Sequence, residues 1–141
     1  MGFDENKNRK TVMPKQKVIK IPFPPMGKPR MTRADKWKCR SEVVRYRQWA
    51  DAMRAFTNGK IPNNPDSVSW NAYMPIPESW SQRKKTAMAG KPHRQKPDRD
   101  NIDKAICDAL WKRDEGIWTG FQAKFWDDGN KPRLVLTMEE L

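Results

Sequence analysis

Apolar side chains recur along this chain with two periods, and each period predicts one kind of secondary structure. Alternation of apolar and polar residues is typical of strands with one buried face. It predicts four strands, at Lys17–Phe23, Ser67–Met74, Gly116–Trp126 and Arg133–Met138. Apolar residues three and four positions apart predict two helices, over residues 34–57 and 101–112. Together these elements predict an α+β fold, in which a small mixed sheet of about four strands has two main helices packed on one face.

Each predicted helix has one continuous apolar stripe. The stripe of the first helix consists of Val43, Tyr46, Ala50 and Met53. The stripe of the second helix consists of Ile102, Ala105, Ile106, Ala109 and Leu110. Asp98 and Asp100 are both suitable residues for the N-terminal cap of the second helix. We therefore expect the stripes to face the core and the polar faces to stay accessible.

Three segments show neither period. We interpret residues 1–16 as a loose basic tail and residues 17–141 as a single domain. One basic loop follows the first strand as far as Lys38, and a longer irregular one runs from Glu78 to Lys96. A loop of that length in a compact domain is more often functional than decorative. Trp80 in this loop has two alternative roles, stacking on an unpaired base or anchoring the loop to the body of the protein.

Positive charge dominates the composition. The chain carries 29 Lys+Arg against 17 Asp+Glu, a net charge of +12. This excess favours a polyanionic partner, either nucleic acid or an anionic membrane. No apolar run approaches the roughly 20 residues that span a bilayer, and Met1–Gln16 lacks the pattern of a signal peptide. We therefore expect a soluble, cytoplasmic protein that has no membrane partner.

Cysteine and histidine are too few for several kinds of chemistry. The two cysteines, Cys39 and Cys107, cannot form a disulfide framework, and neither lies in a Cys-x-x-Cys pair. We expect both to be reduced, half-buried thiols. The single histidine, His93, excludes any mechanism that needs two imidazoles. Catalysis, if the chain is an enzyme, must therefore use carboxylates, lysine or a metal ion.

Carboxylates flank both ends of the second helix, and the one after it can fold back toward the same end of the sheet. Asp98 and Asp100 precede or open it, and Asp114 follows it in the turn to the next strand. These three can form a hard-oxygen pocket for Mg²⁺ or Mn²⁺, and Lys104 can place a positive charge beside a bound phosphate. A structural alternative stays open, in which Asp100 caps the helix and pairs with Lys104, which pairs in turn with Asp108, four residues further on.

The segment from Lys96 to Leu110 resembles the signature of the RusA family of Holliday-junction resolvases, especially its phage and prophage branch. The shared pattern is Asp-x-Asp-Asn, then a lysine, then Asp-Ala-Leu, then a further aspartate before the next strand. Flanking segments are also similar to the family. They are Pro25–Arg30, Pro77–Ser81 with Lys84-Lys85, Gly90–His93, Ile117-Trp118 and Lys131–Arg133. The resemblance covers residues 17–138.

The resemblance implies an α+β homodimer that binds branched DNA and cuts four-way junctions symmetrically with Mg²⁺ or Mn²⁺, without a small-molecule organic cofactor. It implies catalytic and metal-binding roles for Asp98, Asp100 and Asp114, and a catalytic role for Lys104. Asp108 and Glu115 are accessory positions. The chain departs from the family pattern at Arg99, where a leucine is common. It also has Arg113-Asp114-Glu115 in place of the usual paired aspartates, so Glu115 is the substitute for Asp114.

The basic residues fit a branched, highly charged substrate. The expected phosphate contacts are Lys28, Arg30, Arg33, Lys84 and Lys85. Two other functions stay open at this point. A non-catalytic DNA- or RNA-binding protein would use the acidic cluster structurally, and an assembly module would use its charge only for solubility.

Overall fold

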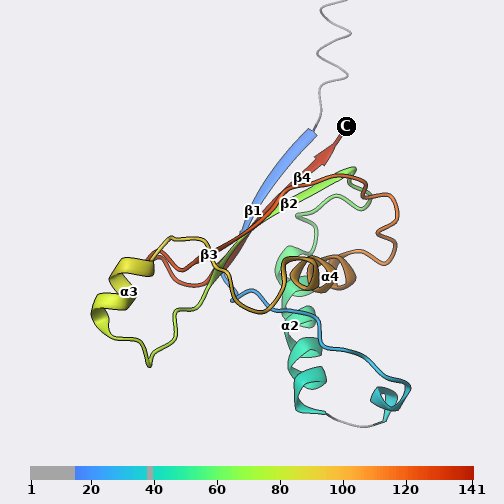
Figure 1. Ribbon diagram of the computed structural model, residues 1–141. Helices are drawn as coiled ribbons and strands as arrows, with labels where there is room; N and C mark the ends of the chain where they lie inside the picture. Colours follow the sequence, from blue (N-terminus) through green and yellow to red (C-terminus); the bar gives the residue numbers. More distant parts are fainter. Residues whose placement is uncertain (1–14, 38–39) are drawn as a thin grey trace, which may run out of the picture.

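A computed structural model describes residues 15–37 and 40–141 of the chain (Figure 1). It contains one four-stranded sheet with the order β1-β4-β2-β3. The strands are β1 (Lys15–Ile21), β2 (Ser67–Met74), β3 (Gln122–Trp126) and β4 (Arg133–Glu140). β4 pairs antiparallel with β1 and β2, whereas β3 runs parallel to β2. The predicted small mixed sheet is therefore confirmed.

Alternation along the strands separates a buried face of the sheet from an open one. Register aligns Trp70 with Leu136 and Ala72 with Leu134, and all four side chains are buried. Trp126, which β3 places beside Met74, is buried on the same face. The next residues along each strand point to the other face. Tyr73, Phe125 and Val135 are half-buried there.

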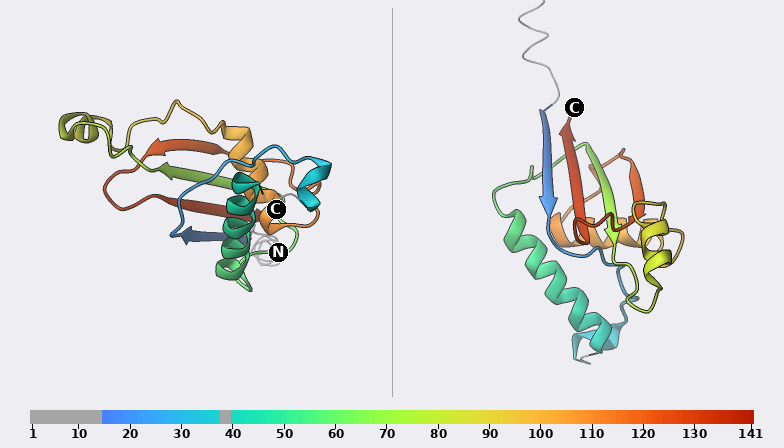
Figure 2. Two further views of the ribbon diagram at one scale, coloured as in Figure 1. Left: turned by 90° about the horizontal axis from the view of Figure 1, so that it is seen from below. Right: turned by 90° about the vertical axis from the view of Figure 1, so that its left-hand side faces the viewer.

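Two helices cover the buried face. Residues of α2 (Ser41–Thr57) and α4 (Arg99–Leu110) join the sheet in one core, through Met53, Ile102 and Ile106. α4 lies across the strands and α2 packs beside it (Figure 2). The Tyr46 hydroxyl donates to the Ala105 carbonyl at 3.2 Å, which ties the two helices together where the small side chains of α4 allow close approach. Both predicted stripes thus face the core, except that Leu110 is only partly buried.

The first predicted helix is divided in two. Its N-terminal part is a short 3-10 helix, η1 (Arg33–Lys36), and α2 begins at Ser41. Asp35 explains much of the difference, because its buried carboxylate receives the Arg40 guanidinium through Nε at 2.8 Å and the Thr32 backbone N–H at 2.5 Å. These contacts hold the chain in a compact turn where uninterrupted helical periodicity predicts a straight helix.

The long basic loop contains a third helix that periodicity does not predict. This helix, α3 (Gln82–Met88), has no buried residue and therefore no apolar stripe. Its start carries a local signal, since the Ser81 hydroxyl accepts a hydrogen bond from the Lys84 N–H at 3.2 Å. In Figures 1 and 2, α3 lies well away from α2 and α4.

Other boundaries differ from the predictions by a few residues. α4 starts two residues earlier than expected, at Arg99, and β3 starts at Gln122 instead of Gly116. Ahead of β3 the backbone of Gly120 lies against β2 so tightly that a Cβ there would stand 2.0 Å from the Val68 carbonyl oxygen. The predicted tail at residues 1–16 falls almost wholly outside the described residues. Of the helices that the structure describes, none is both long and apolar enough to cross a membrane.

Candidate active site and nucleic-acid interface

The start of α4 presents two accessible carboxylates. Asp98 occupies the N-cap position in an extended conformation, and its carbonyl accepts the Ile102 N–H at 3.1 Å. Its side chain does not cap the helix. Asp100 lies in the first turn, and both side chains are exposed. Within the described ranges, neither carboxylate has a hydrogen-bond or ion-pair partner, so both are available to a ligand.

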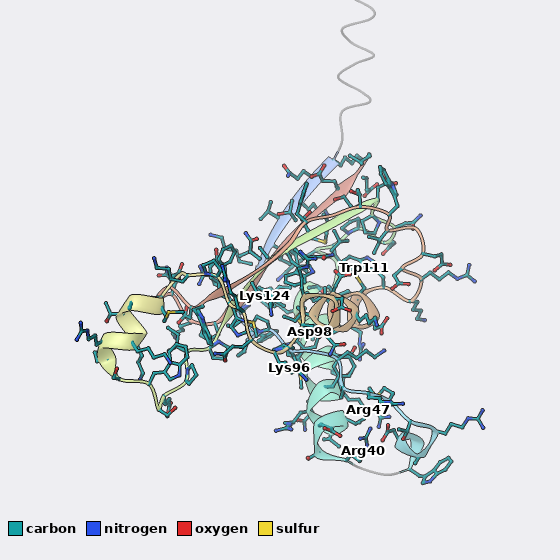
Figure 3. The ribbon with its side chains drawn as sticks, in the orientation of Figure 1. Arg40, Arg47, Lys96, Asp98, Trp111 and Lys124 are labelled. Carbon is teal, nitrogen blue, oxygen red and sulfur yellow. The ribbon has the colours of Figure 1, made fainter. Side chains whose placement is uncertain are left out.

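A lysine from β3 fixes the segment that leads into α4. Lys124 Nζ donates to the Gln95 carbonyl at 2.7 Å and to the Pro97 carbonyl at 2.8 Å. Burial lowers the pKa of Lys124, and the nearby Asp98 carboxylate opposes that shift. Figure 3 shows Lys124 and Asp98 close to each other at this end of the helix. Sequence reasoning missed this residue, although a lysine in the same alternating row as Trp126 was a signal.

The segment after β1 packs along α4. The Lys28 N–H donates to the Asn101 carbonyl at 3.3 Å, and the Lys28 ammonium forms an ion pair with Asp108. Gly27 makes this approach possible, because a Cβ there would stand 2.6 Å from Cβ of Pro97. Two predicted site residues, Lys28 and Asp108, are thereby joined.

A cationic hollow lies where this segment meets α4. It has a volume of about 320 Å³ and is lined by Lys28, Pro29, Arg30, Asn101 and Lys104. Three of the predicted functional lysines and arginines therefore share one small concave site. The alternative ladder from Asp100 through Lys104 to Asp108 is not formed among the described residues, since Asp108 pairs with Lys28 instead.

Other predicted contacts lie elsewhere. Arg33 belongs to η1, and Lys84 and Lys85 belong to α3. Lys84 Nζ stands 4.1 Å from the centroid of the Trp80 ring. Trp80 itself packs on Trp126, with ring centroids 4.7 Å apart. Of its two alternative roles, the structure favours the anchor over base stacking.

Asp114 lies beyond the C-terminal end of α4 and is exposed. Burial, followed by the charges of Asp103, Asp114 and Asp108, raises the pKa of the Cys107 thiol to about 12. These three carboxylates therefore lie near the Cys107 thiol. Asp103 has a structural partner, because it accepts a hydrogen bond from the Trp70 indole at 2.9 Å.

Cys107 is a free thiol as expected, although it is buried rather than half-buried. Cys39 falls outside the described residues.

The predicted metal pocket is not assembled as such. Over residues 15–37 and 40–141, no three His, Cys, Asp or Glu side chains lie together in a way that could hold a metal ion. The donors nevertheless have suitable chemistry, because accessible carboxylate oxygens are the ligands that Mg²⁺ and Mn²⁺ prefer. The assignment of Asp98, Asp100 and Asp114, with Glu115 as substitute, stays a prediction.

A protein-family model described as endodeoxyribonuclease RusA matches residues 22–139. No curated protein matches the chain significantly. The matched range begins at the end of β1 and includes α2, α4 and the cationic hollow.

Proposed function

Because the chain belongs to the endodeoxyribonuclease RusA family, we propose that it resolves four-way DNA junctions by paired, symmetric cleavage that depends on Mg²⁺ or Mn²⁺. Membership of this family implies DNA binding and Holliday-junction endonuclease activity. The metal dependence, the residues and the symmetry are our proposal.

The observation that carries the proposal is the position of the cationic hollow. Lys28, Arg30 and Lys104 line it, and Asn101 connects it to the start of α4, where Asp98 and Asp100 are accessible. A DNA phosphate bound by the hollow would lie next to carboxylates that are free to hold a cation. Positive side chains cannot replace the carboxylates in this role, and carboxylates alone would repel the phosphate.

The chain's own residues bind and orient the scissile phosphate. Lys28 and Arg30 neutralise its negative charge. Lys104 adds positive charge next to the oxygens on which further negative charge develops during cleavage. Asp98 and Asp100 would hold the divalent cation, which would supply charge neutralisation and an activated water. Asp114, which lies beyond the other end of α4, is the third ligand that we propose. Lys124 acts as a positioning residue, because its two hydrogen bonds to carbonyls fix the backbone next to Asp98.

Symmetric resolution requires two active sites, and we propose that a homodimer supplies them. Two copies related by a twofold axis would place their sites on strands of matching polarity. The open sheet face is the surface that supports this assembly. It carries Val135, the stacked rings of Tyr73 and Phe125 at 5.6 Å, and Phe121, which is 85% exposed.

The proposal is tested with a synthetic four-way junction in Mg²⁺, Mn²⁺ or EDTA, using wild type and Asp100→Asn. Wild type is expected to make paired nicks in both metals and none in EDTA. Asp100→Asn is expected to bind the junction normally and to cut it more than about 100-fold more slowly, since a metal contributes several kcal/mol to such transition states.

Asp51→Asn is the matched control, because Asp51 is an exposed aspartate on α2 that pairs only with Arg54 among the described residues. It should cut at the wild-type rate. Undiminished cleavage by Asp100→Asn would refute the site assignment. Metal-independent binding with no cleavage by wild type would favour a non-catalytic DNA-binding protein.

A further inference from the structure

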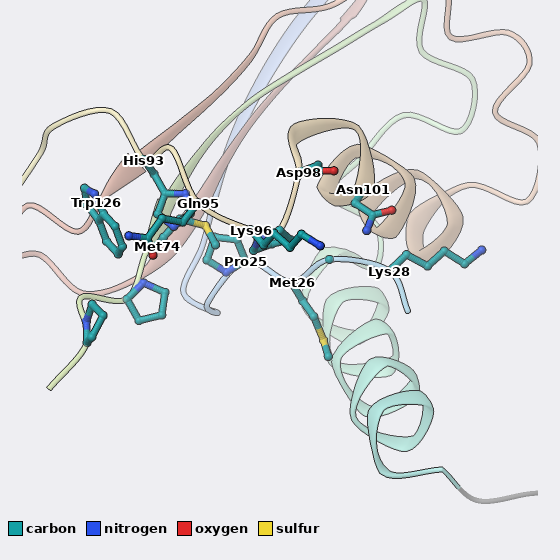
Figure 4. A pocket seen from close by; sticks show the side chains of 14 residues that line it. Pro25, Met26, Lys28, Met74, His93, Gln95, Lys96, Asp98, Asn101 and Trp126 are labelled. Carbon is teal, nitrogen blue, oxygen red and sulfur yellow. The ribbon is translucent and has the colours of Figure 1, made fainter. Parts of the chain in front are cut away.

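A second, larger cavity lies beside the cationic hollow. It has a volume of about 640 Å³, and Figure 4 shows its lining. One part of the wall is apolar, with Met74, Pro77 and Trp126. Another part offers polar groups from His93, Gln95 and Asn101. This volume and this mixture of surfaces are typical of sites for small planar ligands.

His93 in this cavity has an unsatisfied nitrogen. The residue is 6% exposed, and its ring lies 4.3 Å from the Trp126 ring, centroid to centroid. Its Nδ1 is buried and has no hydrogen-bond partner among the described residues. Burial, with a contribution from Lys124, lowers the pKa of His93, so the ring is neutral near pH 7. A buried polar atom without a protein partner is costly in a native protein unless a water or a ligand satisfies it.

The cavity adjoins the proposed cleavage site. Asp98 lines it, and Lys28 and Asn101 line both this cavity and the cationic hollow. A ligand that spans the two sites therefore needs a negative group at one end and a flat, partly polar body at the other. A nucleotide of the DNA substrate has this form.

We propose that the cavity receives one unstacked base of the junction, adjacent to the phosphate that is cut. The inference rests on the proposed function and extends it to the recognition of a single base. Trp126 and the apolar wall contact the base, while His93 and Gln95 form hydrogen bonds with its polar edge. Bases at the crossover of a four-way junction are less costly to unstack than bases within an arm, because the crossover interrupts the continuous stack on one side of them.

The test is a series of four-way junctions, each with one abasic position near the scissile phosphate, cut under single-turnover conditions in Mg²⁺. Removal of one particular base is expected to lower the rate roughly 5- to 150-fold, and removal of the others to change it little. Changing the identity of that base should alter the rate roughly 2- to 10-fold.

Two variants connect this effect to the cavity. Gln95→Trp places a bulky ring at its polar side from an exposed position, and it should cut abasic and intact junctions at equal, reduced rates. Gln82→Trp, the same change on α3 outside the cavity, should keep the abasic effect. His93→Phe keeps a ring against Trp126 but removes both nitrogens. It should keep the dependence on the presence of a base and lose the dependence on its identity.

Equal wild-type rates at every abasic position would overturn the base site while leaving the resolvase function intact. An abasic effect that persists fully in Gln95→Trp would overturn it as well. A wild-type chain that cuts no junction at all would instead refute the proposed function, and the base site with it.

Discussion

Lys124 illustrates how one charged residue can serve a site that it does not enter. It lies in the core-facing row of β3 between Gln122 and Trp126, yet its ammonium reaches the backbone that precedes Asp98. The two carbonyls of residues 95 and 97 need a donor there, since no strand pairs with them. The positive charge of Lys124 therefore stabilises the backbone of residues 95–97. Lys124 would affect the site by fixing the position of this backbone.

Lys124→Met should remove both hydrogen bonds and leave two carbonyls without this donor. We expect a loss of about 1–3 kcal/mol in the free energy of unfolding. The cleavage rate should fall roughly 10- to 100-fold, because Lys124 fixes the backbone next to Asp98, a proposed metal ligand, while the Kd for the junction changes little. Urea unfolding and separate kcat and Kd measurements check this. Lys91→Met, which removes an equal charge from an exposed position, should leave both quantities unchanged.

His93 makes stability depend on pH. Burial and Lys124 lower the pKa of His93 in the folded protein below the unfolded value of about 6.5. The folded state thus binds a proton less readily than the unfolded chain. The part of the free energy of unfolding that depends on neutral His93 is fully present above about pH 6.5 and declines as the pH falls below that value. Urea midpoints measured between pH 7.5 and 5 should fall in wild type more than in His93→Phe. Parallel curves for the two proteins would contradict this assignment.

At the scale of elements, α4 carries most of what the site needs. One face contributes Ile102 and Ile106 to the core, another contributes Ala105 and Ala109 to the contact with α2, and the remaining face is left for Lys104. The helix contacts the segment after β1 through a glycine, so the cationic hollow depends on two elements far apart in sequence.

Gly27→Ala should disturb that contact, because the new Cβ would lie 2.6 Å from Cβ of Pro97. The segment must shift, which strains the Lys28–Asp108 ion pair and widens the cationic hollow. Overpacking of this kind costs about 1–3 kcal/mol. We expect a lower urea midpoint together with weaker junction binding, measured by gel shift in EDTA. Unchanged binding would show that the segment does not form part of the DNA site.

Sequence alone predicted the elements that bury apolar stripes and failed where polar contacts decide the structure. β2 was predicted with its observed bounds, because four buried residues alternate along it. α3 was missed because a short, exposed helix leaves no periodicity. The turn at Asp35 depends on a hydrogen-bonded ion pair with Arg40, and Lys28 pairs with Asp108, which is far away in sequence. Hydrophobic periodicity predicts neither of these polar contacts. Asp98 and Asp100 were predicted at the start of α4, where the structure has them, because they come just before its apolar stripe. Their role as metal ligands stays a prediction.

At the scale of the whole molecule, the sheet has two unlike faces. One is filled by α2 and α4, and no helix of the described segments joins the core from the other side. The open face combines apolar side chains with Arg133, whose guanidinium lies 3.8 Å from the Tyr73 ring centroid. Such a face, together with the paired cleavage that we propose, favours self-association.

Val135→Glu should therefore convert a dimer to a monomer without unfolding the chain. Val135 is half-buried on the open face, opposite Lys20 and Asn71 in the register. Multi-angle light scattering should give twice the chain mass of 16.6 kDa for wild type and the chain mass for the variant. Val44→Glu on α2 serves as the control and should stay dimeric. A monomeric wild type would contradict the assembly, and so would a dimeric Val135→Glu.

The buried Cys107 thiol can be used to measure local unfolding of α4. The sulfur is enclosed between α4 and the sheet and stays protonated at neutral pH, because its pKa is raised to about 12. An alkylating reagent can reach it only in molecules whose helix has left the strands. The rate at which Cys107 is labelled, followed by peptide mass spectrometry, therefore measures how often α4 separates from the sheet by local unfolding. DNA bound to α4 should slow this labelling.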